Sequence, residues 1–177
     1  MPQLTAPTAA VRRSYLAGLA EFRAEGRLGP DDHSMLGWAA RDVPEDPAGF
    51  ERYTAMIRAL ALPDGPRPEG WVPCSELWYV DDDEWLGHLN LRHRLTPGLL
   101  EVGGHIGYDV RPSARRRGHA TAMLREGLAV ARSLGIESAL LTCDHDNAAS
   151  RRVIEKAGGV LEDQRGDKLR FWVPTEG

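Results

Sequence analysis

The sequence has little cysteine and no long run of apolar residues. Cys74 and Cys143 are the only two cysteines among 177 residues, and they do not form a C-x-x-C pair. Their small number and spacing exclude a disulfide framework and a thiolate zinc site, and they indicate reduced thiols. The N-terminal segment lacks the apolar core of about 7 to 15 residues of a signal peptide, and no stretch approaches the roughly 18 of a membrane span. We expect a soluble, cytoplasmic protein with no membrane partner.

Positive charge is not in excess either. Lysine and arginine number 22 against 26 aspartates and glutamates, so the formal net charge is -4. Such a balance repels polyanions, and we therefore expect no nucleic-acid partner. The length predicts a single domain spanning residues 1–177, large enough to bury one core.

Hydrophobic periodicity indicates helices and strands in the order ααβββαβαββ. Apolar residues recur at helical spacing in segments 8–22, 47–60, 120–134 and 148–158. Thr8, Asp46 and Asn147 stand where these helices need an N-cap. Strand patterns occupy 75–80, 84–93, 105–110, 138–144, 160–165 and 168–173. The fold class is α/β (α+β), with a mixed sheet flanked by helices.

Positive charge is concentrated at Arg115, Arg116 and Arg117, between a strand and a helix. Backbone N–H groups at the start of a helix attract an anion, and Gly118 permits the positive φ that such a loop requires. Arginine adds planar donors suited to phosphate oxygens. The loop thus predicts a phosphate site, although a solvated basic patch with a turn glycine is the alternative. No P-loop or dinucleotide fingerprint is present, since the glycine-rich segment 103–108 precedes a strand.

These features resemble the GNAT superfamily of N-acetyltransferases. The acetyl-CoA signature of that family is matched by Arg115, Gly118 and Ala120, preceded by V-R-P at 110–112. The block TCDHDNAASRRVIEKAGG at 142–159 resembles the strand and helix that follow in the family. The segments LRHRL at 91–95 and GGHIGYDVRP at 103–112 are similar to a bacterial group of predicted acetyltransferases. The resemblance implies a mostly antiparallel sheet whose fourth and fifth strands splay apart.

The resemblance also implies acetyl-CoA as the co-substrate and assigns residues to it. Strand residues Tyr108, Asp109 and Val110 are expected beside the pantetheine arm, and Asn147 and Ser150 at the next helix start. The expected pyrophosphate loop consists of Arg115, Arg116, Arg117, Gly118, His119, Ala120 and Thr121.

Acetyl transfer by direct attack of a primary amine requires a proton acceptor, because an alkyl ammonium has a pKa of about 10. His105 is the first candidate for this base, with His93 and Glu76 as alternatives. The resemblance places a tyrosine proton donor at position 154, but this chain has Ile154 there. Tyr108 and Ser150 are therefore the expected substitutes for the catalytic acid. A zinc site at His88, His93 and His105 is not expected, because helical ligand spacing is absent.

The acceptor is expected to be a small-molecule amine or a protein N-terminus. Its pocket should form from the first two helices and from segments 63–74 and 92–102, where Arg92, Arg94 and Glu101 carry charge. Trp71, Trp78 and Trp85 either line this pocket or pack in the core. A non-catalytic acyl-CoA-binding sensor or scaffold is the alternative function, supported by Ile154, and a homodimer is a further possibility that the family suggests.

Overall fold

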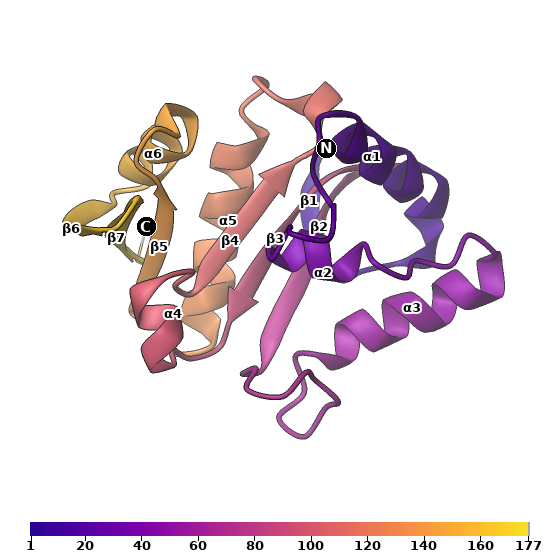
Figure 1. Cartoon of the computed structure of the whole chain (residues 1–177), viewed down its shortest axis with the longest axis horizontal. Coiled ribbons are helices and arrows are strands. Elements are labelled where there is room, and N and C mark those ends of the chain that lie inside the picture. The colour runs from indigo at the N-terminus through magenta and orange to yellow at the C-terminus, as the bar shows by residue number, and fades with distance from the viewer. Residues whose placement is uncertain (177) are drawn as a thin grey trace.

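The computed structural model describes residues 1–176, which fold around one seven-stranded sheet (Figure 1). The strand order is β1-β2-β3-β4-β5-β7-β6, and every neighbouring pair is antiparallel except β4 and β5. The strands are β1 Gln3–Thr5, β2 Cys74–Asp81, β3 Glu84–Arg92, β4 Ile106–Val110, β5 Ser138–Asp144, β6 Val160–Arg165 and β7 Lys168–Pro174. The expected mixed, mostly antiparallel sheet is therefore confirmed.

Six α-helices accompany the sheet in the described residues. They are α1 Arg12–Ala24, α2 Met35–Ala39, α3 Pro47–Ala59, α4 Pro97–Glu101, α5 His119–Ser133 and α6 Ala148–Lys156. The sequence pattern did not predict β1, α2 and α4, because three to five residues are too few to show a period. Within residues 1–176, no helix is long and apolar enough to cross a membrane.

The predicted N-caps are confirmed. The Thr8 side chain accepts from the Ala10 N–H, at the 3-10 turn that leads into α1. Asp46 accepts from the Gly49 N–H at 2.7 Å, and Asn147 accepts from the Ser150 N–H at 3.1 Å. Each cap satisfies a backbone donor that the first helical turn leaves without a partner, so these residues set where the helices begin.

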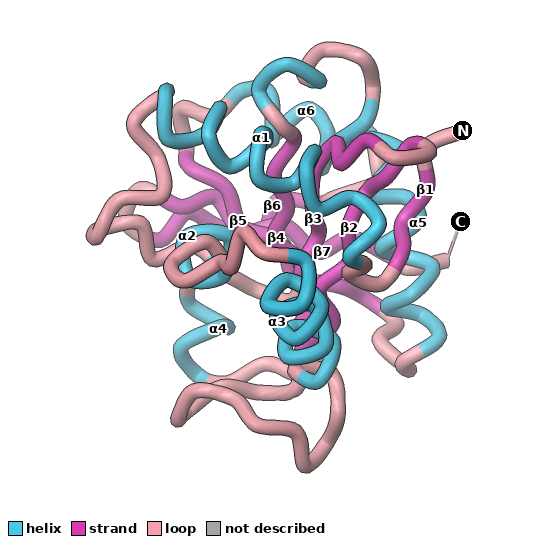
Figure 2. The backbone as a smooth tube through the Cα atoms, turned by 90° about the vertical axis from the view of Figure 1, so that its right-hand side faces the viewer, coloured by secondary structure: helices cyan, strands magenta, loops and turns pink. Residues whose placement is uncertain are grey.

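Helices cover both faces of the sheet, and each face has its own apolar core. Helices α1, α2 and α3 pack on β2 and β3, and Figure 2 shows α3 in front of the strands. The largest buried side chains of this core are Tyr15, Phe22, Phe50, Trp78 and Trp85. Helices α5 and α6 cover the opposite face, over a core that includes Leu89, Leu91, Leu141, Ile154 and Phe171. Any group on a central strand therefore faces one helical layer or the other.

The sheet opens between β4 and β5. These parallel strands pair at one position within residues 1–176, Ile106 with Leu141. At the start of β4 the strands stay together, because the His105 N–H donates to the Leu140 carbonyl at 2.7 Å. Beyond Ile106 they diverge, so the edge of β4 that faces β5 becomes available to a ligand.

Candidate active site

A groove of about 690 Å³ runs beside the N-terminus of α5 and the N-terminus of α6. All of the residues expected to hold acetyl-CoA line it, apart from Arg117: Tyr108, Asp109, Val110, Arg115, Arg116, Gly118, His119, Ala120, Thr121, Asn147 and Ser150. Glu25, Arg27, Ala114, Ala149 and Val153 complete the wall. The structure thus brings three separate sequence motifs to one surface.

The N-terminus of α5 faces this groove without a side-chain cap. Gly118 is the N-cap residue, with φ +82° and ψ 3°, and no side chain accepts from the first turn. This left-handed conformation costs about 1 to 2 kcal/mol in a residue with a Cβ. The first N–H groups of the helix, together with the helix dipole, form a site that suits an anion such as a pyrophosphate.

The three arginines of the loop differ in their surroundings. Arg115 is already paired, because its guanidinium donates to both carboxylate oxygens of Glu25 at 2.7 and 2.9 Å. It also donates to the Val110 carbonyl, so it fastens the loop to α1 and β4. Arg116 lines the groove with φ +65°, whereas Arg117 is exposed and is not among the lining residues. The expected contact of Arg117 with the cofactor therefore stays a prediction, since its side chain is exposed beside the groove and does not line it.

Tyr108 and Ser150 form a hydrogen-bonded pair on the groove wall. The hydroxyl groups lie 3.1 Å apart and come from β4 and α6, respectively. Burial raises the pKa of Tyr108 to about 12, so its hydroxyl is protonated at neutral pH. Ile154, in contrast, is 1% exposed and packs in the core under α6. The structure therefore brings together the two hydroxyl groups expected to replace the missing tyrosine.

A second cavity, of about 530 Å³, opens beside the splayed strands and shares Tyr108 and Asp109 with the groove. Alternation along β4 directs successive side chains to opposite faces. The Tyr108 side chain meets α6, whereas Asp109 contacts His88 and the Arg27 side chain that follows α1. The face that holds the carboxylate is therefore opposite to the face that holds the hydroxyl pair.

Backbone donors of β4 also point into the opening. Two hydrogen bonds lie at the two ends of the β3–β4 ladder. In one the Arg92 N–H donates to the His105 carbonyl, and in the other the Arg111 N–H donates to the Leu86 carbonyl. Antiparallel pairing makes alternate residues bond to the same neighbour. Tyr108 and Val110 therefore turn their N–H groups away from β3, toward β5, where the strands have separated.

A buried chain of charged groups supports Asp109. His88 Nδ1 lies 2.6 Å from Glu76 Oε1, and His88 Nε2 lies 3.2 Å from Asp109 Oδ2. The Asn90 amide donates to Glu76, and Arg27 donates to Asp109 at 2.6 Å. Burial by itself would lower the pKa of His88, but Glu76 and Asp109 raise it to about 10. Burial opposes ionisation of Asp109, yet its bonds to His88 and Arg27 lower its pKa. Asp109 is thus an ionised carboxylate at neutral pH.

The structure does not bring the expected base His105 to this site. His105 is 7% exposed, and its Nδ1 accepts from the Leu140 N–H at 2.9 Å. Burial lowers its pKa, and neither the groove nor the second cavity includes it among the described residues. His105 joins β4 to β5 where they still touch. His93 likewise lies apart, with its Nε2 2.8 Å from the Ser75 hydroxyl.

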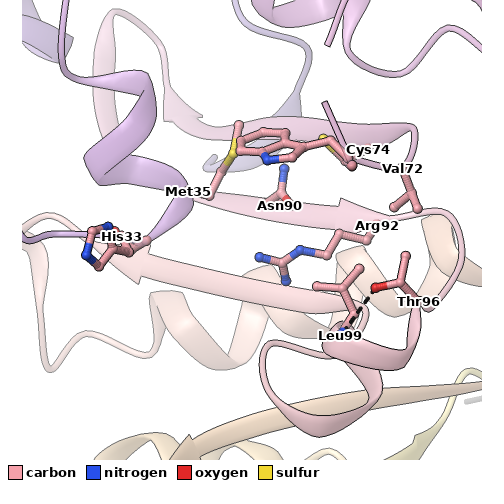
Figure 3. A pocket seen from close by; sticks show the side chains of 11 residues that line it. His33, Met35, Val72, Cys74, Asn90, Arg92, Thr96 and Leu99 are labelled. Atoms are coloured by element: carbon pink, nitrogen blue, oxygen red, sulfur yellow. Dashed lines mark hydrogen bonds between the residues drawn. The ribbon is translucent and has the colours of Figure 1, made fainter. Parts of the chain in front are cut away.

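A third cavity, of about 210 Å³, continues from the second one on the same face (Figure 3). Its walls come from the residues before and at the start of α2, and from segments around Trp71, Arg92 and Leu99. The expected segments 63–74 and 92–102 contribute, whereas the expected first two helices are replaced by α2. Trp78 and Trp85 are core residues, and Glu101 pairs with Arg165. Arg94 is exposed and does not line the cavity.

Sequence analysis missed Arg27, Asp32 and the role of His88. Arg27 and Asp32 lie in the loop after α1, where Asp32 accepts from Arg27, Ser34 and the Leu28 N–H. Nothing in the sequence relates this loop to β4. His88, however, alternates with apolar neighbours in a strand that is almost entirely buried. Polar residues at period two in such a strand are a signal that could have identified this face.

Comparisons with known proteins agree on one family. The family model of the acetyltransferase (GNAT) domain matches residues 13–160. A curated relative, mycothiol acetyltransferase from Beutenbergia cavernae, is 28% identical over 150 residues, which cover 85% of this chain and 48% of that protein. The chain therefore spans about half the length of this relative.

Solved structures share the fold over nearly the whole chain. A ribosomal-protein-S5-alanine acetyltransferase from Vibrio fischeri has a TM-score of 0.69 at 11% identity, covering 99% of this chain and 93% of that one. Mycobacterium smegmatis RimJ, in complex with CoA-disulfide, has a TM-score of 0.64 at 20% identity, covering 99% and 82%. RimL, a ribosomal L7/L12 alpha-N-protein acetyltransferase in complex with coenzyme A, has a TM-score of 0.65 at 15% identity, covering 98% and 93%.

Proposed function

Because this chain belongs to the GNAT family of acetyltransferases, we propose that it transfers the acetyl group of acetyl-CoA to a primary amine by direct attack. The observation that carries the proposal is the placement of two opposite functional faces around the opening between β4 and β5. One face of β4 carries the hydroxyl pair and the other carries the ionised carboxylate, and both groups border the groove and the second cavity.

The groove suits acetyl-CoA in shape and charge. When bound, acetyl-CoA supplies the acetyl group as a thioester, whose C–S bond is exchanged for an N–C bond to the amine. The uncapped N–H groups of Gly118, His119, Ala120 and Thr121 would hold the pyrophosphate, and the exposed Arg116 would add positive charge. The Tyr108 and Val110 backbone groups at the open edge of β4 would hold the pantetheine arm.

Asp109 is the proposed proton acceptor. Its ionised carboxylate lies at the boundary of the groove and the second cavity, where it attracts the acceptor's ammonium group. His88 and Arg27 hold both carboxylate oxygens and fix their direction. These neighbours also make Asp109 too weak a base to deprotonate an alkyl ammonium group, so the nucleophile is the fraction of the acceptor that has lost its first proton to solvent. Asp109 then accepts the second proton, which becomes far more acidic as the N–C bond forms.

Groups on β4 and α6 would stabilise the two negative charges that develop during transfer, on the carbonyl oxygen and on the departing thiolate. A negative charge develops on the carbonyl oxygen during attack, and the backbone N–H of Tyr108 or Val110 at the splayed edge can stabilise it. Tyr108, whose hydroxyl is paired with Ser150, is the proposed donor of a proton to the departing thiolate. This assignment fills the role that Ile154, a core residue, cannot perform.

The test is acetyl-CoA-dependent release of free thiol in the presence of a broad panel of primary amines, with mass spectrometry of the products. Turnover with at least one amine, reduced about 100-fold in Tyr108→Phe and Asp109→Asn while acetyl-CoA still binds, is the expected result. Tight acetyl-CoA binding without turnover of any amine, peptide N-termini included, would instead favour the non-catalytic sensor.

A further inference from the structure

One cation in the acceptor cavities is left without an acidic partner. Among the described residues that line the second and third cavities, Arg27 pairs with Asp32 and Asp109, His88 with Glu76 and Asp109, and Lys168 with Asp144. Arg92 also lines both cavities, and it forms no ion pair within residues 1–176. Within the described residues, the guanidinium of Arg92 is therefore open to an anionic group of a ligand.

The Arg92 guanidinium is fixed by two hydrogen bonds, and some of its N–H groups remain available to a ligand. Its Nη1 donates to the carbonyls of Gly103 and Gly104 at 3.1 and 3.3 Å, which fixes the guanidinium. Within the described chain, Nε and Nη2 donate to no acceptor. Figure 3 shows the guanidinium extending from β3 into the space between Met35 and Leu99. A planar fork with free N–H groups in a partly buried cavity is the arrangement that binds a carboxylate.

The position of Arg92 relates such a carboxylate to the reacting amine. An ideal Cβ on Gly107 would lie 3.9 Å from Arg92 Nη1, so the guanidinium sits beside Gly107. Asp109 is two residues further along the same face of β4, which is about 7 Å for an extended chain. One acceptor can therefore contact Asp109 with its amine and Arg92 with an anionic group only if several bonds separate its amine from that anionic group.

We propose that the acceptor is an amino carboxylate whose carboxylate pairs with Arg92 while its amine lies at Asp109. The inference rests on the proposed function, because it concerns the acceptor of that reaction. Met35 lines both cavities and would pack against the carbon chain between the two groups, whereas Trp71 and Leu99 line the third cavity next to Arg92. Arg92 is thus a residue that determines specificity, and it takes no part in bond making.

The experiment compares ω-amino acids of increasing length, α-amino acids and short peptides, each as the free acid and as the C-terminal carboxamide. Thiol release gives kcat/KM for the wild type, Arg92→Gln, Arg92→Lys and Arg94→Gln. The wild type is expected to prefer the free acid of at least one acceptor by about 10- to 100-fold, as charge-assisted hydrogen bonds imply. Arg94→Gln is the matched control, since Arg94 is exposed and lines neither cavity.

Arg92→Gln should remove the preference by slowing the acids while leaving the amides and the acetyl-CoA Kd unchanged. A purely structural role of Arg92 would slow both forms alike. Arg92→Lys keeps the charge and should retain part of the preference, which preserves the test if Arg92→Gln does not fold. Equal rates for acids and amides, a preference that survives in Arg92→Gln, or no turnover of any panel member would overturn the inference. Failure to bind acetyl-CoA would reject the proposed function instead.

Discussion

Replacement of Gly118 by glutamate tests whether the N-terminus of α5 binds the pyrophosphate of acetyl-CoA. The position adopts φ +82°, and an ideal Cβ there meets no heavy atom within 4 Å, so a side chain would project into open space at the start of α5. Any residue with a Cβ loses about 1 to 2 kcal/mol of stability in this conformation. Glutamate adds a negative charge at the proposed pyrophosphate site.

The effect of the charge can be estimated from Coulomb's law for a phosphate in contact with the new carboxylate. Two like unit charges 4 Å apart near a protein surface repel each other by about 4 kcal/mol, which approaches a thousandfold change in Kd. The side chain can turn toward solvent, and salt screens the repulsion. We therefore expect the acetyl-CoA Kd of Gly118→Glu to rise at least about 50-fold, and the rise to shrink at high ionic strength.

Calorimetric titration of the folded proteins with acetyl-CoA measures this change, with thermal melting as the check on folding. Gly118→Gln carries the same backbone strain without the charge and should lose much less affinity. Gly166→Glu is a second control, because Gly166 has φ +59°, an open environment and a place in the β6–β7 turn. A folded Gly118→Glu protein with the wild-type Kd, or a folded wild type that does not bind acetyl-CoA, would refute the assignment of the groove.

Further outcomes follow from the hydroxyl pair, Asp109 and His88. Tyr108→Phe should lower kcat about 100-fold with little change in the acetyl-CoA Kd, and Ser150→Ala should have a smaller effect. The wild-type rate should show no alkaline decline from this hydroxyl below pH 10, because its pKa is about 12. Asp109→Asn should lower kcat/KM about 100-fold and the free energy of unfolding by about 1 to 3 kcal/mol, because Arg27 and His88 lose a charged partner. The pKa of His88 is raised from 6.5 to about 10 in the folded protein. Its contribution to the free energy of unfolding should therefore be fully present below pH 6.5 and decline by at most about 4 kcal/mol as the pH rises toward 10. Chemical denaturation at several pH values should show this decline in the wild type and not in His88→Gln.

The parts of this protein that the sequence predicted well depend on local chemistry. Helical spacing located the long helices, and Asp46 and Asn147 marked helix starts because a cap acts on N–H groups only two or three residues away. Gly118 marked the start of α5, where the structure has an uncapped turn with positive φ, and the anion site at that turn stays a prediction. Local motifs of this kind also carried the resemblance to the family.

Local sequence patterns did not predict the short helices or the partners of side chains that are distant in the sequence. Helix α2 has five residues and no visible period, yet it forms a wall of the third cavity. Arg115 looked like a phosphate ligand, but Glu25, 90 residues away, already occupies its guanidinium. His105 looked like the base, but the register of β4 beside β5 commits its ring to the Leu140 N–H.

The sequence by itself determined the long helices and the strands other than β1, since these depend mainly on neighbours along the chain. It also predicted an anion site from the same kind of local signal. It also named Tyr108 and Asp109 without deciding which helical layer each would face. That decision belongs to the tertiary structure, because the face of a strand is set by its pairing register and by the helices packed on it. The packing of α6 against one face of β4, and of the loop after α1 against the other, placed the hydroxyl pair and the carboxylate on opposite faces. It also left Arg92 in the cavity wall without an ion pair to any residue of 1–176.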